Sequence, residues 1–132
     1  MRRLALGLVT IAVASVWLVT AAAPAGAHAA IESTDPANGE LLEEPPSQIV
    51  LTFTEPPDID LTIVSVVDSS GAKMPTGPPE RAPGSNREIH VRLDPVPDGV
   101  YTVTWRTVSA TDGHVTSNAF SFGVGVAPGD VT

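Results

Sequence analysis

The chain has 132 residues, with 7 lysines and arginines against 15 aspartates and glutamates, a formal net charge of −8 and no cysteine. This length fits a single domain. The lack of cysteine excludes disulfide scaffolds, thiolate metal sites and thiol nucleophiles, so a metal ion would have to bind through nitrogen and oxygen. The negative charge argues against nucleic acid, which is a polyanion, and favours a cationic ligand.

Residues 1–27 have the composition of an export signal. Arg2 and Arg3 precede an apolar run from Leu4 to Ala23, and Ala25-Gly26-Ala27 supplies the small side chains that signal peptidase requires. We therefore expect cleavage after Ala27, an extracytoplasmic location (periplasm, cell envelope or secreted) and no membrane insertion of the mature chain. The apolar run is also long enough to span a bilayer, so retention as an uncleaved anchor is the alternative.

The mature chain is more acidic than the whole sequence. Five basic residues remain after the signal against all 15 acidic ones, which gives a formal net charge of −10. We expect one folded domain over residues 28–126 and a short tail at residues 127–132. Short runs of alternating apolar and polar residues, separated by Pro, Gly, Asp and Asn, predict an all-β fold for this domain.

Seven strands are predicted by this alternation. In chain order they are residues 29–33, 40–42, 48–54, 61–67, 87–93, 101–107 and 119–124. This number over about a hundred residues is typical of an immunoglobulin-like Greek-key β-sandwich. Tyr101, Val103 and Trp105 share one face by the two-residue period of a strand, and Trp105 is predicted to lie at the centre of the core.

The segment from Met74 to Asn86 lacks this alternation and contains four prolines. We therefore predict a loop that is long for so small a domain. Met74 is interpreted as a loop residue and not as a metal ligand.

His28 would be the first residue of the processed chain. A free α-amino group and the Nδ1 atom of the same histidine can close a six-membered ring on one metal ion. The precursor lacks that amine, so cleavage would create the chelating group.

Asp112-Gly113-His114 is the second candidate piece of a metal site. If this stretch is extended, the carboxylate and the imidazole project to the same side and Gly113 permits close approach. With the His28 amine and imidazole they would form a donor set of three nitrogens and one oxygen, which favours Cu(II), with Zn(II) as the competitor. Asp-Gly is also common turn chemistry, so the motif taken alone is compatible with a simple turn.

Two other groups of candidate ligands are explained without a metal. His90 lies between Glu88 and Arg92 on the outward face of a predicted strand, where a solvated histidine is ordinary. The acidic residues of the segment from Glu55 to Asp60 resemble a calcium loop only weakly, because a double proline interrupts them and the required glycine is missing.

Six pieces of the sequence match one known family in order and spacing. They are His28 directly after the signal, Ser33–Gly39 (STDPANG), Leu51–Glu55 (LTFTE), Tyr101–Arg106 (YTVTWR), Ser109–His114 (SATDGH) and Phe120–Phe122 (FSF). Through these pieces essentially the whole mature chain resembles the CopC family of periplasmic and cell-surface copper-binding proteins.

The resemblance implies a Greek-key β-sandwich that holds one Cu(II) per chain through the His28 amine and imidazole, Asp112 and His114. Glu55 matches a family glutamate beside the site and is expected to have a supporting role. Some members carry a second, Cu(I) site built from several methionines, and the single methionine of the long loop argues against such a site here. Asn118 replaces a family glycine, which we expect to alter a strand turn only.

The leading functional hypothesis is a monomeric, non-enzymatic Cu(II) carrier or buffer in copper resistance or homeostasis, with a membrane copper transporter as a possible recipient. One alternative is a copper-dependent oxidative enzyme, because such enzymes also use an N-terminal histidine chelate. The small size, the few aromatic residues and a coordinating Asp112 argue against it. The other alternative is a metal-free immunoglobulin-like adhesion module, whose function would not require His28 or His114.

Overall fold

The computed structural model describes residues 29–129. The predicted signal peptide at residues 1–27, its cleavage site and His28 lie outside the described residues. Residues 29–129 form eight strands and one short 3₁₀ helix, η1 (Ile59–Leu61). No helix in this part of the chain is long and apolar enough to cross a bilayer.

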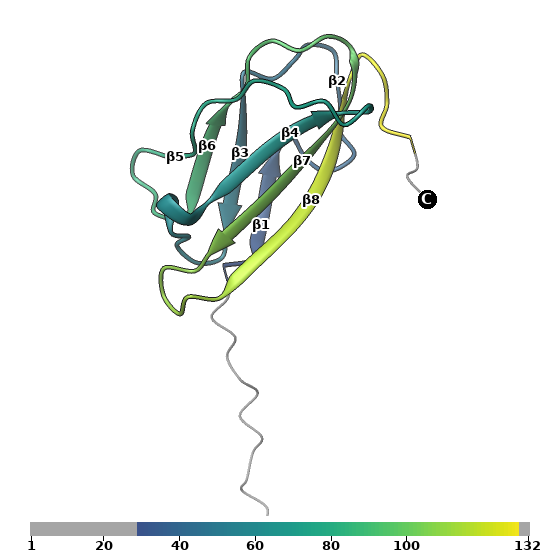
Figure 1. Ribbon diagram of the computed structural model, residues 1–132. Helices are drawn as coiled ribbons and strands as arrows, with labels where there is room; N and C mark the ends of the chain where they lie inside the picture. Colours follow the sequence, from purple (N-terminus) through teal and green to yellow (C-terminus); the bar gives the residue numbers. More distant parts are fainter. Residues whose placement is uncertain (1–28, 130–132) are drawn as a thin grey trace, which may run out of the picture.

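The strands form two four-stranded sheets that pack face to face (Figure 1). Sheet A has the order β1 (Ile31–Asp35), β3 (Gln48–Phe53), β6 (Glu88–Arg92) and β5 (Glu80–Arg81). Sheet B has the order β2 (Leu41–Leu42), β8 (Val115–Val124), β7 (Gly99–Val108) and β4 (Ile63–Asp68). The prediction of an all-β sandwich is confirmed.

Buried and exposed side chains alternate strictly along the central strands. In β3, Ile49, Leu51 and Phe53 are fully buried, while the residues between them are partly exposed. In the neighbouring β6, Ile89 and Val91 are buried in the same way, and they pair antiparallel with Leu51 and Ile49. Because one face of each strand enters the core, a register slip of one residue would expose the whole apolar set.

Aromatic side chains from both sheets meet in the core. Trp105 is only 6% exposed and contacts Phe53 of the opposite sheet edge-on, with ring centroids 5.4 Å apart. Tyr101 stacks on Phe122 at 5.7 Å, and its hydroxyl donates a hydrogen bond to the Pro97 carbonyl at 2.5 Å. Burial raises the pKa of Tyr101 above its ordinary value, consistent with a phenol held neutral. The predicted core position of Trp105 is confirmed.

Several predicted strand bounds were wrong. The first strand begins at Ile31 and not at residue 29, and its register shifts between Ile31 and Ser33. The last strand begins at Val115, four residues before the predicted start. The prediction missed the first part of this strand because residues 115–119 do not alternate between buried and exposed positions.

The long segment after β4 is less irregular than predicted. Met74 donates its backbone N–H to the Val66 carbonyl at 2.8 Å, and Gly77 donates to Arg92 at 2.9 Å. The segment also contains β5, which pairs with β6. The Met74 side chain is partly buried against the core, so it is a packing residue.

One end of the sandwich gathers the segments that carry the predicted ligands. The start of β1, the end of β3 and the turn between β7 and β8 all lie at this end (Figure 1). The end of β8, paired with β2, lies at the opposite end. We call the first of these ends the site end.

Candidate metal centre

Ser109 organises the turn between β7 and β8. It is 2% exposed, and its hydroxyl accepts hydrogen bonds from the backbone N–H groups of Thr111 at 3.2 Å and Asp112 at 3.4 Å. Its own N–H donates to the His114 carbonyl at 2.8 Å, and its carbonyl accepts from Gly113 at 2.9 Å. One buried serine therefore fixes the backbone on both sides of Asp112.

Asp112 and His114 are brought together by this turn and not by an extended strand. The Asp112 Oδ1 atom accepts the backbone N–H of His114 at 3.0 Å, and Gly113 has a φ of +71°, the left-handed region that glycine adopts without strain. The stretch is therefore a turn and not the extended segment in which both side chains would project to the same side. Both residues are exposed at the surface of the site end.

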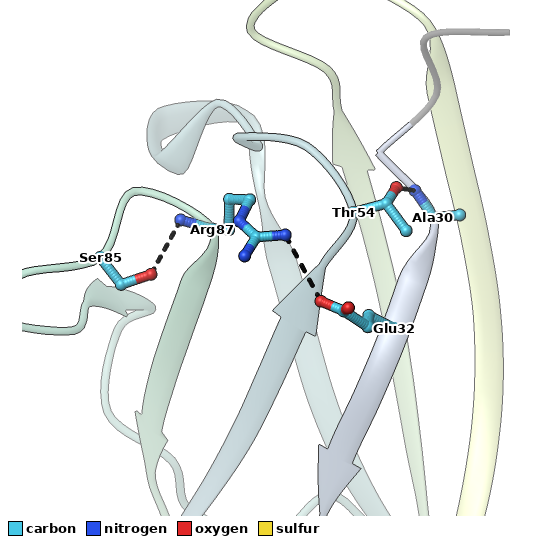
Figure 2. A network of polar contacts seen from close by, with 5 residues as sticks. All are labelled: Ala30, Glu32, Thr54, Ser85 and Arg87. Carbon is cyan, nitrogen blue, oxygen red and sulfur yellow. Dashed lines mark hydrogen bonds and ion pairs between the residues drawn. The ribbon is translucent and has the colours of Figure 1, made fainter. Parts of the chain in front are cut away.

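The first described residues are tightly held at the same end. Ala29 is fully buried, and its carbonyl accepts a hydrogen bond from the Thr116 hydroxyl at 2.8 Å. Ala30 donates its N–H to the Thr54 hydroxyl at 3.2 Å and accepts the Thr54 N–H at 2.8 Å (Figure 2). Thr116 lies two residues after His114, so the start of the described chain is fixed beside the β8 end of the turn.

An ionic contact joins β1 to the residue that precedes β6 in the same sheet. Glu32 pairs with Arg87 at 3.5 Å across the end of β3, and the Arg87 N–H donates to the Ser85 hydroxyl at 3.3 Å (Figure 2). Both charged side chains are about half exposed, so the pair adds little to stability. It orients the start of β1 toward β6.

Glu55 lies where the chain crosses from sheet A to the turn. The next residue, Pro56, accepts the N–H of Ala110 at 3.0 Å, and Pro57 forms a bridge with Ser109. The Oε2 atom of Glu55 is buried and has no hydrogen-bond partner in the structure. A buried carboxylate oxygen without a partner is unfavourable, so this atom fits a position beside a cation or a hydrogen-bond donor.

The described residues do not by themselves complete a metal site. No three His, Cys, Asp or Glu side chains within residues 29–129 lie together as a metal-binding group. The structure brings Asp112 to His114 and places the Glu55 segment against the same turn. The predicted role of His28 lies outside the described residues.

The other candidate ligands have structural roles. His90 Nε2 lies 2.6 Å from Glu88 Oε1 on the outer face of β6, in agreement with its interpretation as a surface residue. Asp58 caps η1, since its Oδ1 accepts the N–H of Asp60 at 3.0 Å. Neither residue takes part in the turn between β7 and β8.

Sequence reasoning missed three hydroxyl residues of the site end, Ser109, Thr116 and Thr54. Their contacts fix the backbone beside the predicted ligands. Only Ser109 carries a local signal, because a serine two and three residues before turn N–H groups is typical of side-chain-capped turns.

A comparison with family models identifies the chain. The CopC domain model matches residues 31–125. The chain belongs to the CopC family. This match covers every described strand and the turn with Asp112 and His114.

A curated relative is the copper transport protein CutJ of Bacillus subtilis. It is 32% identical over 104 residues, which cover 78% of this chain. The chain spans 19% of the length of that relative, so the region in common is a small part of the larger protein.

Two solved structures have the same fold. CopC from Methylosinus trichosporium OB3b is 22% identical, with a TM-score of 0.69 over 74% of this chain and 93% of that one. PcoC from Escherichia coli, described as a methionine-rich copper resistance protein, is 27% identical, with a TM-score of 0.62 over 74% of this chain and 99% of that one. Membership of this family of copper-resistance and copper-transport proteins agrees with the prediction that the chain is not an enzyme.

Proposed function

We propose that the mature protein is an extracytoplasmic carrier or buffer that binds one Cu(II) at the site end. The ion would be held by the α-amine and imidazole of His28, the imidazole of His114 and the carboxylate of Asp112. Glu55 would support the site without being a required ligand. The proposal rests on the predicted processing after Ala27.

The observation that carries this proposal is the fixed position of Ala29. The residue that follows His28 in the sequence is buried and bonded through its carbonyl to Thr116, which lies two residues after His114. Consecutive Cα atoms are about 3.8 Å apart, so a donor on residue 28 is within reach of the turn. In the proposed site the nitrogen donors would come from two segments, the residue before Ala29 and the turn between β7 and β8, and the position of Ala29 supports this arrangement.

The chemistry of the donors supports copper in the divalent state. Amine, imidazole and carboxylate groups suit a tetragonal arrangement of nitrogen and oxygen around Cu(II), and Cu(II) has the highest affinity in the divalent series. Soft thioether ligands, which favour Cu(I), are represented in the described part of the chain by Met74 alone, and that side chain packs against the core. We therefore propose no Cu(I) site.

Charge and buried polarity support the same assignment. The predicted mature chain has a formal net charge of −10, which attracts cations over a distance set by the ionic strength. The Glu55 oxygen without a partner lies on the segment bonded to the turn, where a cation or a metal-bound donor would satisfy it.

We propose a membrane copper transporter as the recipient and a monomer as the working form. The support for the recipient is the relative that is described as a copper transport protein, in which the matched region is 19% of the polypeptide.

The decisive experiment compares two forms that differ at the N-terminus alone. One form begins at His28, and the other carries one additional glycine before it. Both are titrated with Cu(II) against a chelator of known affinity. The extension removes the α-amine from the chelate ring, so we expect Cu(II) affinity to fall by orders of magnitude.

Two further results complete the test. We expect saturation at one Cu(II) per chain and release of the ion below about pH 5, because protons compete for the amine and both imidazoles. Equal Cu(II) affinity in the two forms would refute the proposed site.

A further inference from the structure

Two threonines hold the residues that directly follow His28: Thr116 in β8 of sheet B, and Thr54, which directly follows β3 of sheet A. Thr116 of β8 donates its hydroxyl hydrogen to the Ala29 carbonyl at 2.8 Å. On the other side, the Thr54 hydroxyl accepts the N–H of Ala30 at 3.2 Å, as Figure 2 shows, and the Thr54 N–H donates to the Ala30 carbonyl at 2.8 Å. Ala29 and Ala30 are thus fixed between sheets A and B before β1 begins.

This degree of order is unusual for the first residues of a domain, which normally fray unless something ties them down. The Ala29 methyl group is fully buried in the core cluster, so apolar contact and hydrogen bonding act on the same residue. The pairing with sheet A continues from Ile31, which lies opposite Phe53. The chain is therefore ordered up to the residue next to His28.

Each threonine lies close in the sequence to a residue of the proposed site. Thr116 lies two residues after His114, and Thr54 immediately precedes Glu55. Thr116 also lies opposite Thr107 in sheet B, and Thr107 is fully buried and hydrogen-bonded to Thr62 at 2.7 Å. Three threonines thus lie side by side, Thr62 at the end of η1, Thr107 in β7 and Thr116 in β8, and Thr116 contacts the N-terminal segment.

A fixed N-terminal segment lowers the entropy lost when a metal ion binds. Ordering one backbone residue opposes binding by roughly a factor of ten. If Ala29 and Ala30 were mobile, a metal ion that binds the N-terminal residue would have to order three residues and not one. A segment that is already fixed removes most of this opposition.

We propose that Thr116 and Thr54 are positioning residues that preorganise the N-terminal chelate for Cu(II). This inference rests on the proposed function, and it adds that the protein holds Ala29 and Ala30, the residues next to His28, in place before the ion arrives. Neither hydroxyl touches the ion. Their effect is transmitted through the backbone of Ala29 and Ala30 to His28.

The test uses the form that begins at His28, with the substitutions Thr116→Val and Thr54→Val made singly and together. Valine keeps the shape of threonine and removes the hydroxyl. We expect each single variant to bind Cu(II) roughly threefold to tenfold more weakly, mainly through faster dissociation, with a larger loss in the double variant. In the metal-free protein, Thr54→Val should speed hydrogen exchange at the Ala30 amide, measured by NMR.

Two control variants separate positioning from general destabilisation. Thr102→Val removes a hydroxyl that bonds Ser121 at 3.1 Å across the same pair of strands, away from the site end. It should leave Cu(II) affinity unchanged. Thr116→Ser retains the donor and should restore the affinity lost in Thr116→Val.

The outcomes distinguish a failure of the positioning role from a failure of the proposed Cu(II) site. Wild-type Cu(II) affinity in Thr116→Val and Thr54→Val, or equal weakening by Thr102→Val, would overturn the positioning role alone. If the unsubstituted protein binds Cu(II) equally well with an extra N-terminal glycine, the proposed site fails, and the positioning role fails with it.

Discussion

Two turns that contain an aspartate and a glycine lie at opposite ends of sheet B. The aspartate carboxylate has a different role in each turn. In the first turn, Asp68 Oδ1 accepts hydrogen bonds from the Ser70 N–H, the Ser70 hydroxyl and the Ala72 N–H at 2.7 to 2.9 Å. In the second turn, Asp112 Oδ1 accepts the backbone N–H of His114, whose side chain is an imidazole.

The difference shows that neighbours, and not residue type, decide what an aspartate turn does. Around Asp68 the neighbours are hydroxyl and amide donors, which satisfy the carboxylate and close the turn after β4. Around Asp112 the turn is closed mainly by Ser109, and the side chains displayed are an anion and an imidazole. The first turn is therefore structural, and the second is suited to a metal ion.

The largest expected effect tests the imidazole of the second turn. His114→Ala should weaken Cu(II) binding by more than about 100-fold, because the loss of a ligand exceeds the roughly 10- to 100-fold effect of losing an outer partner. His90→Ala is the matched control, since His90 pairs with Glu88 on the outer face of β6. Chelator competition measures both variants, and equal weakening would show that histidines bind Cu(II) nonspecifically.

The next prediction compares the two aspartates directly. Asp112→Asn and Asp68→Asn keep the shape of the side chain and remove its charge. We expect Asp112→Asn to lower Cu(II) affinity by about tenfold or more, with little change in the urea midpoint of the metal-free protein. Asp68→Asn should lower the urea midpoint and leave Cu(II) affinity unchanged, and the reverse pattern would contradict the assignment of the two turns.

The smallest expected effect is the pH dependence of the first turn. The hydrogen bond from the Ser70 hydroxyl, with further bonds from the backbone, lowers the pKa of Asp68 below its ordinary value of 3.8. The ionised form therefore stabilises the fold above the ordinary pKa, and this contribution is lost as pH falls through the lowered pKa. Urea unfolding between pH 6 and pH 2 should show a smaller acid loss for Asp68→Asn than for the wild-type protein, and an identical loss in both would contradict the structural role.

Much of the fold could be predicted because the central strands obey simple alternation. The buried positions of β3 and β6 follow a two-residue period, and the aromatic residues of β7 fall on one face. The start of β8 could not be predicted, because none of its first five residues is fully buried and the two-residue alternation is missing there. The short β5 was hidden in a proline-rich segment and forms through its pairing with β6.

The candidate site was predicted from residue types and from the family resemblance, but its local geometry was not. The sequence pattern left open whether Asp112-Gly113-His114 is extended or a turn, and it is a turn because the Ser109 hydroxyl accepts two backbone N–H groups there. The bond between Thr116 and Ala29 joins positions 87 residues apart, so no local pattern could predict it. Such contacts depend on the packing of the two sheets.

The most direct test of the proposed Cu(II) site is electron paramagnetic resonance of the protein that begins at His28, with one equivalent of Cu(II). The account predicts a tetragonal spectrum with superhyperfine splitting from nitrogen ligands, and a loss of part of that splitting when His114 is replaced by alanine. A spectrum without nitrogen splitting, or one left unchanged by an additional N-terminal residue, would contradict it.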